Sequence, residues 1–197
     1  MSSYGVYRTK TYIAGDWDGD KVAIQKLYEW KESRWYTLDF VDAHSVTQAR
    51  DSSLNCSIKR SLKERLDISK TFVLVVGANT NSVRAGQCTY CPEYRTFYYS
   101  SPSCSHHNTI DNRSFIEYEC EKAKDAGIKI VVLYNYLTVD KSKCPEAIRY
   151  TGTHLPMYYR GDDGKEYFIC LFKDIVISCN LTWRPFHCLI WTGNSTF

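Results

Sequence analysis

Two apolar runs stand out along a chain that otherwise alternates between amphipathic and polar segments. Thr71 to Gly77 (TFVLVVG) and Ile128 to Leu133, which is apolar except for Lys129, each have the length of a strand. Strands of this kind are covered on both faces, which is typical of a parallel sheet with helices on either side. We expect both segments in the interior of such a sheet, because neither is polar enough for an exposed edge.

Amphipathic segments between the strands predict helices. Lys21 to Glu32 follows an acidic turn in which Asp18 or Asp20 could cap the helix. A second helix is expected from about Ser53 to Ser69, where apolar residues fall four apart, at Ile58, Leu62 and Leu66. The residues expected on its exposed face are mostly basic: Lys59, Arg60, Lys63, Glu64 and Arg65.

The stretch Asn112 to Asn135 has the form of a helix that runs into the second buried strand, with Gly127 between the two. Glu119 lies near the start of this helix, where the helix dipole favours an ionised carboxylate. In open α/β sheets, helix starts face the ligand crevice at the carboxyl ends of the strands, so Glu119 is expected to face that crevice. Glu117 and Glu121 should point to other faces of the helix and be solvated.

Shorter segments complete the predicted sheet. Thr9 to Ala14, Tyr36 to Val41 and His154 to Tyr159 are expected to be strands. Lys165 to Ser178 is apolar on nearly every side and fits a closing helix or a strand equally well. The chain is therefore expected to form one α/β domain over residues 1–197, with a mainly parallel five-stranded sheet and helices on both faces.

A long irregular connection separates the third strand from the Asn112 helix. Ala78 to Asp111 is rich in Asn, Ser, Tyr, Cys and Pro, and connections of this length usually carry a function or an insertion. We interpret 84–109 as an insertion that borders the crevice. The C-terminal tail, 180–197, has no clear period, and packing, pairing with another copy of the chain and disorder all remain open for it.

Composition and charge exclude several classes of function. The net charge of +3 arises from Lys and Arg that are interleaved with acids, which predicts no nucleic-acid partner. The N-terminus lacks the apolar core of a signal peptide, and no apolar run approaches the roughly 20 residues that span a bilayer. We therefore expect a cytoplasmic protein with no membrane contact, in which the nine cysteines are mostly reduced thiols.

Polar residues at the predicted strand ends are candidates for substrate contacts. The loop GDWDGD after the first strand contains Asp16, Asp18 and Asp20, and Asp42 and His44 follow the second strand. The spacing of the three aspartates is like part of a calcium loop, but the downstream Gly and Glu do not follow at the required places. We therefore expect these residues to contact substrate rather than metal, although a loop His is more often a surface residue.

The insertion contains a possible zinc site. Cys88 and Cys91 form a C-x-x-C pair, and Cys104 and His106 follow at a distance that would allow a Cys3His site. Because cysteine is abundant throughout and the last spacing is tight, we favour no metal. The alternative is an aromatic flap over the domain, built from Tyr90, Tyr94, Phe97, Tyr98 and Tyr99.

Two motifs and their order resemble the TIR-like domains of prokaryotes, most closely the ThsB family of the Thoeris anti-phage system. One is the G-x-N-T segment Gly77 to Thr80 after a buried strand, and the other is the aromatic-x-x-x-Glu signature Phe115 to Glu119. The resemblance covers roughly Thr9 to Tyr159 and implies a flavodoxin-like TIR-type fold. The chain departs from the family in having Phe115 where Trp is commoner, and in the insertion.

What the resemblance implies is chemistry on NAD+, with NAD+ as substrate and no separate cofactor. Catalytic TIR domains cleave the nicotinamide–ribose bond through a transition state that resembles an oxocarbenium ion, and Glu119 matches the position of their essential carboxylate. Phe115, Asn79 and Thr80 then join Asp16, Asp18, Asp42 and His44 as expected substrate-binding residues. Without the resemblance, a Glu at a helix start is most often a dipole and solubility choice.

The resemblance also implies partners. Thoeris proteins of this type are thought to release a cyclic ADP-ribose isomer as a diffusible signal, after a phage-derived trigger, and the signal activates an NAD-depleting effector, ThsA. A homo-oligomer stays open. The competing hypothesis is a TIR-type interaction module that assembles with partner proteins and has no turnover.

Overall fold

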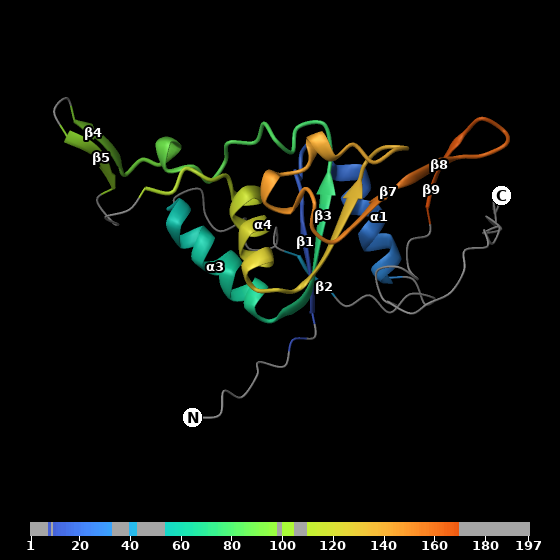
Figure 1. Ribbon diagram of the computed structural model, residues 1–197, viewed down its shortest axis with the longest axis horizontal. Helices are drawn as coiled ribbons and strands as arrows, with labels where there is room; N and C mark the ends of the chain where they lie inside the picture. The colour runs from blue at the N-terminus through green and yellow to red at the C-terminus, as the bar shows by residue number, and fades with distance from the viewer. Residues whose placement is uncertain are drawn as a thin grey trace, which may run out of the picture.

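A five-stranded parallel sheet forms the centre of the computed structural model, which describes residue 8 and residues 10–32, 40–42, 54–97, 100–104 and 110–169. The strands run in the order β2-β1-β3-β6-β7, and every neighbouring pair is parallel (Figure 1). They are β1 (Lys10–Ala14), β2 (Phe40–Asp42), β3 (Ser69–Val76), β6 (Lys129–Tyr134) and β7 (Thr153–Pro156). The predicted α/β fold is confirmed, with both apolar runs inside the sheet.

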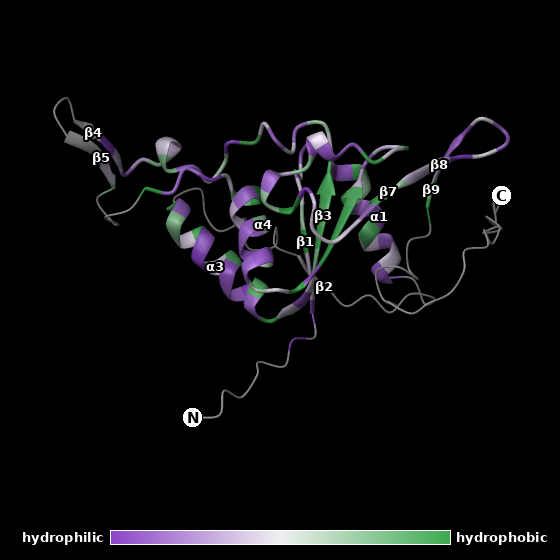
Figure 2. Ribbon diagram, viewed as in Figure 1, coloured by the Kyte–Doolittle hydropathy of each residue, from purple (hydrophilic) through white to green (hydrophobic). Residues whose placement is uncertain are grey.

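Helices cover both faces of the sheet. α1 (Lys21–Glu32) packs on one face, and α3 (Asn55–Asp67) and α4 (Phe115–Asp125) lie together on the other (Figure 1). Side chains of β3 alternate between the two, with Val73 and Val75 facing α1 and the side chains of Phe72, Leu74 and Val76 in the opposite cluster. This two-sided burial explains why β3 is apolar from Phe72 to Val76 (Figure 2).

The boundaries of α4 follow from local chemistry. The hydroxyl of Ser114 accepts a hydrogen bond from the backbone N–H of Glu117, and the Glu117 carboxylate accepts one from the N–H of Ser114, which forms a capping box. The helix ends at Asp125, and Gly127 adopts a φ of 60°, as the sequence predicts for the residue that ends this pattern. Glu117 is therefore a capping residue rather than the freely solvated side chain that was expected.

The elements after β7 differ in part from the expectation. Of the two forms expected for Lys165 to Ser178, its described part shows the strand, because β9 (Glu166–Phe168) pairs with β8 (Tyr158–Arg160) in an antiparallel hairpin; the rest of that segment lies outside the described residues. The fifth strand ends at Pro156, and the chain passes through Met157 directly into β8. Side-chain packing explains the hairpin, since Phe168 contacts Tyr158 and Trp30.

The segment after β3 lies outside the sheet. It contains a 3-10 turn at Cys88–Tyr90 and the antiparallel pair β4 (Tyr94–Phe97) and β5 (Ser100–Cys104), which project beyond α3 (Figure 1). Tyr90 is exposed, so it does not pack as part of an aromatic flap. The tail at 180–197 lies outside the described residues.

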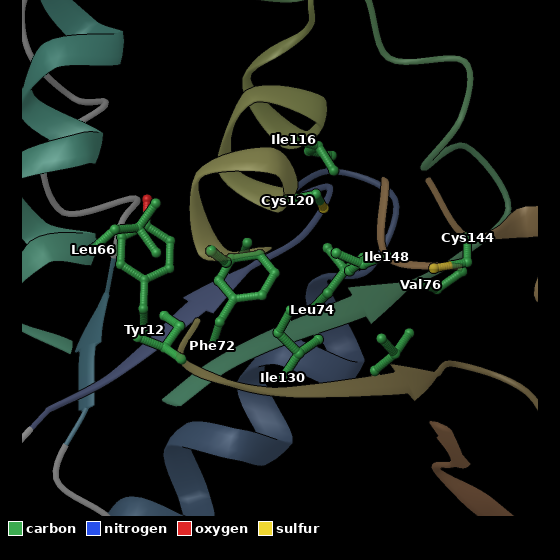
Figure 3. Close-up of a cluster of buried hydrophobic side chains, with 14 of the residues drawn as sticks. Tyr12, Leu66, Phe72, Leu74, Val76, Ile116, Cys120, Ile130, Cys144 and Ile148 are labelled. Atoms are coloured by element: carbon green, nitrogen blue, oxygen red, sulfur yellow. The ribbon is translucent and has the colours of Figure 1, made fainter. Parts of the chain in front are cut away.

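The buried face of β3 should dominate stability. Leu74 is fully buried between β3 and α4 (Figure 3), so Leu74→Ala should lower the free energy of unfolding by about 2–5 kcal/mol. Val22 is 68% exposed on α1, and Val22→Ala should stay within about 0.5 kcal/mol of wild type. Urea unfolding of both variants tests this, and equal losses would contradict the assignment of the core.

Candidate functional site

A buried carboxylate lies where three parallel strands end. The side chain of Asp20, from the loop after β1, is 1% exposed and rests against Gly77 at the end of β3. Its Oδ1 atom accepts a hydrogen bond from the amide of Asn135, which follows β6, at 2.9 Å. A Cβ atom on Gly77 would lie 1.8 Å from Asp20 Oδ1, so glycine is required there.

Residues predicted to bind substrate lie around this carboxylate. Asp16 is half-buried, Asp18 is exposed, and a Cβ on Gly19 would come within 3.4 Å of both the Asp16 carboxylate and the Asn79 amide. Asn79 is exposed, whereas Thr80 is buried and its hydroxyl accepts a hydrogen bond from the N–H of Gly77 at 2.8 Å. The structure therefore brings Asp16, Asn79 and Thr80 to one edge of the sheet, with Thr80 serving the turn.

The electrostatics of Asp20 are those of a desolvated acid. Burial raises the pKa of Asp20 above its ordinary value, the Asn135 amide lowers it, and the charge of Asp16 raises it again. The Oδ2 atom is buried without a hydrogen-bond partner among the described residues. The expectation that Asp20 could cap α1 is not met, because its Oδ1 atom binds Asn135 and its Oδ2 atom has no partner among the described residues.

Glu119 lies in a different environment from the one predicted. It is 5% exposed in the second turn of α4, and its Oε1 atom accepts a hydrogen bond from the hydroxyl of Tyr12 on β1. Tyr12 is fully buried and stacks on Phe72 with ring centroids 5.8 Å apart (Figure 3). The carboxylate is therefore held inside the layer between the sheet and the helices.

The two carboxylate sites lie on opposite faces of the sheet. Tyr12 belongs to the cluster that α3 and α4 cover, whereas Gly15, which precedes the Asp20 loop, approaches Ile24 of α1. That Glu119 shares a crevice with Asp16 and Asn79 stays a prediction. Strand register places the Tyr12–Glu119 pair beside the end of β2, because Tyr12 pairs with Val41 and Ile13 with Asp42.

The remaining predicted residues fall in three places. Phe115 is half-buried at the start of α4, its N–H donates to the carbonyl of Ala85 at 2.8 Å, and its ring lies against Gly86. Asp42 is the last residue of β2, and its backbone pairs with Ile13 of β1. His44 and His106 lie outside the described residues.

Lys59 is buried rather than exposed, which corrects the sequence expectation. Its ammonium group pairs with the Asp111 carboxylate at 3.1 Å and donates to the carbonyls of Asp111 and Arg113 at 3.2 and 2.8 Å. Burial alone would raise the pKa of Asp111, but hydrogen bonds from Arg113 and Lys59 outweigh it and lower the pKa to about 2. Arg113 also pairs with Glu121, which is therefore not the simply solvated residue that was expected.

Two residues of these sites, Tyr12 and Asn135, are not predicted from the sequence. Tyr12 lies in a mostly buried strand, and a buried tyrosine usually needs a partner for its hydroxyl. Asn135 follows the buried strand β6 directly, in the position where crevice residues occur. Both signals are present in the sequence, but neither identifies the partner.

Comparison with known proteins gives one family. Residues 11–86 match the model of the Thoeris protein ThsB, TIR-like domain. The match includes α1, β2, α3, β3 and nearly all of β1, and it ends before α4. The resemblance predicted from the motifs is confirmed over these residues. No curated protein matches the chain significantly.

No helix among the described residues is long and apolar enough to cross a bilayer.

Asp20 should make stability depend on pH. Because its pKa is raised in the folded state, its contribution is fully present below the ordinary value of 3.8 and is lost as pH rises through the raised pKa. Asp20→Asn should remove this loss and flatten the dependence of unfolding free energy on pH above about 4. Urea titrations across pH compare the two proteins; parallel curves would show that Asp20 does not titrate in this way.

Proposed function

We propose that this chain, which is ThsB-like over residues 11–86, is an anti-phage TIR-like enzyme that cleaves NAD+ at the nicotinamide–ribose bond. The observation that carries the proposal is the burial of Glu119, together with the hydroxyl that Tyr12 directs at it. An ionisable residue inside a domain costs free energy, so its presence needs a reason. The position of Glu119 in the aromatic-x-x-x-Glu signature supports a catalytic one.

Lys59 offers a useful contrast. It is also buried, but its three oxygen partners tether α3 to the segment that enters α4, which accounts for the side chain structurally. The Tyr12–Glu119 pair joins β1 to α4 inside an already well-packed apolar cluster, where an apolar pair of similar volume would serve stability as well or better. A chemical role explains why a carboxylate is there.

The proposed chemistry requires one carboxylate near the ribose. The bond between the anomeric carbon and the nicotinamide nitrogen breaks, and nicotinamide leaves as a neutral base with the bonding electron pair. The Glu119 carboxylate stabilises the positive charge that develops on the ribose ring. Because nicotinamide is cationic in NAD+, its departure needs no general acid.

The product depends on what attacks the anomeric carbon. Water would give ADP-ribose and release a proton, whereas a nucleophilic atom of the same molecule would give a cyclic ADP-ribose isomer. We propose the cyclic product, acting as a diffusible signal in the cytoplasm to activate the effector ThsA after a phage-derived trigger. Exclusion of water around a carboxylate as deeply buried as Glu119 favours the internal nucleophile.

The strand-end group has a separate part in this proposal. Asp16 and Asn79 present a carboxylate and an amide at the sheet edge, where they would accept and donate hydrogen bonds to a polar ligand. Because the proposal gives the reacting bond to Glu119, we assign Asp16 and Asn79 to a distal portion of the substrate.

The competing function is a non-catalytic interaction module. It is favoured by one observation, namely that the family match ends at residue 86 and so does not include Glu119. The two hypotheses differ in whether loss of the Glu119 charge abolishes an activity.

Glu119→Gln should abolish signal production while the protein still folds. The amide keeps an acceptor for Tyr12 but loses the charge, and a barrier change of about 4 kcal/mol would lower turnover by roughly three orders of magnitude. Glu117→Gln is the matched control, because glutamine preserves a capping box and its side chain serves the helix start. Both variants are assayed for cyclic product by mass spectrometry, in purified form and in lysates of infected cells, beside thermal melts. A folded Glu119→Gln protein with wild-type signal would refute the assignment.

Tyr12→Phe should lower kcat with little change in KM. Loss of a hydrogen bond to a charged group is worth about 1.5–3 kcal/mol, which corresponds to a roughly 10- to 100-fold decrease in kcat. Tyr134→Phe is the control, since Tyr134 is equally buried and loses a hydroxyl bonded to His154 at 2.9 Å. Equal kinetic losses in the two variants would mean that Tyr12 acts only on stability.

A further inference from the structure

Four cysteines from separate turns of the chain line one cavity of about 320 Å³. The cavity lies between α3 and the segment that follows β3. Cys56 comes from the first turn of α3, Cys88 and Cys91 from the two ends of a 3-10 turn, and Cys104 from the end of β5. All four carry free thiols, and none is fully exposed.

Backbone and side-chain contacts fix two of these cysteines near each other. The amide of Asn55, next to Cys56, donates to the carbonyl of Gln87, next to Cys88, at 3.0 Å. Cys88 is also tied to Asp111, whose N–H donates to the Cys88 sulfur at 3.3 Å and whose carbonyl accepts from the Cys88 N–H at 3.1 Å. Since Lys59 holds Asp111 against α3, Cys88 is anchored beside Cys56.

The other two cysteines are placed by a turn and a hairpin. The N–H of Cys91 donates to the carbonyl of Cys88 at 2.9 Å, and the N–H of Tyr94 donates to the carbonyl of Cys91 at 3.0 Å. Tyr94 pairs directly with Cys104 in the β4–β5 ladder. A C-x-x-C turn followed by a hairpin that returns a further cysteine to the same place is typical of zinc-binding knuckles and ribbons.

This segment lacks a hydrophobic core of its own. Within 81–96 and 102–104, where side chains are described, only Gly86 and Cys88 are buried. A small unit with so little apolar burial usually needs a disulfide or a metal ion to stay folded. The thiols provide the ligands for a metal.

The charge around the cavity favours a thiolate site. Four thiolates around Zn²⁺ carry a net charge of −2, and the lining of the cavity carries three basic residues (Lys59, Arg60 and Lys63) against one acid, Asp111. Lys59 pairs with Asp111 and Lys63 with Asp67, whereas Arg60 forms no ion pair among the described residues. An N–H donor to a cysteine sulfur, such as that of Asp111 to Cys88, also stabilises a thiolate.

We propose that Cys56, Cys88, Cys91 and Cys104 bind one Zn²⁺ ion, which fastens the segment after β3 to α3. Four thiols lose four protons and form four zinc–sulfur bonds of about 2.3 Å, with no change of oxidation state. In the described part of the chain no three Cys, His, Asp or Glu side chains are already gathered to hold a metal, so the proposal requires the thiols to turn into the cavity that they line. Cys56 takes the place that the sequence assigned to His106.

The experiment measures zinc binding by the full-length protein. The protein is treated with chelator under reducing conditions and titrated with Zn²⁺ against a chromophoric competitor, and metal content is then determined by elemental analysis. We expect one zinc per chain. With Co²⁺ as a probe, the charge-transfer and visible bands should be those of tetrahedral thiolate coordination. Absence of stoichiometric zinc binding in the folded protein would overturn the proposal.

Substitutions identify the ligands. Cys91→Ser and Cys104→Ser change half-buried residues away from the core, and each should weaken zinc binding by at least about 100-fold. Cys144→Ala, which removes a thiol from the main core, should keep full zinc affinity. Cys56→Ser and His106→Ala separate the two fourth ligands: retained binding in Cys56→Ser with loss in His106→Ala would exclude Cys56. Addition of zinc should make the segment after β3 less sensitive to protease in the wild type and in Cys144→Ala. It should have no such effect in the variants that lose a zinc ligand.

Discussion

The alternation of side chains along strands that are covered on both faces is the constraint on which the rest of this structure depends. Because β1, β3 and β6 have helices on either side, each successive residue is assigned to one cluster or the other. Tyr12 faces α3 and α4, whereas Ile13 faces α1. A shift of one residue in register would therefore turn Tyr12 to the other face of the sheet and away from Glu119.

Three buried charged side chains show three solutions to the same physical problem. Lys59 is compensated by a carboxylate and two carbonyls, and it tethers two segments of the chain. Burial raises the pKa of Asp20 and so favours its neutral form, and the hydrogen bond from Asn135 offsets this only in part. Glu119 is held by the hydroxyl of a core tyrosine. The partners of Lys59 give it a structural explanation, and the proposed function rests on Glu119.

Much of the fold could be predicted because local pattern and tertiary structure agree. The helix at Lys21 to Glu32 has the predicted ends, and the apolar runs lie inside the sheet, where periodicity and length suffice for the prediction. The site could be predicted only in part. The signature motif points to Glu119, but its hydrogen-bond partner Tyr12 lies 107 residues away along the chain, and no local pattern reveals such a contact. Lys59 has the spacing of a surface residue, and its burial depends on Asp111 and Arg113, which the insertion brings back to α3.

The segment after β3 leaves and rejoins the domain at nearly the same point. The carbonyl of Ala85 accepts a hydrogen bond from the N–H of Phe115 at 2.8 Å, although Phe115 lies thirty residues further along the chain. The entropy of closing a loop grows only slowly with its length, which makes the sheet nearly indifferent to how much chain lies between these two residues. Proteins that share this sheet and the α4 cap could thus gain, shorten or exchange the excursion as a module. Whatever the excursion recognises can then diversify while the buried carboxylate on α4 stays where it is.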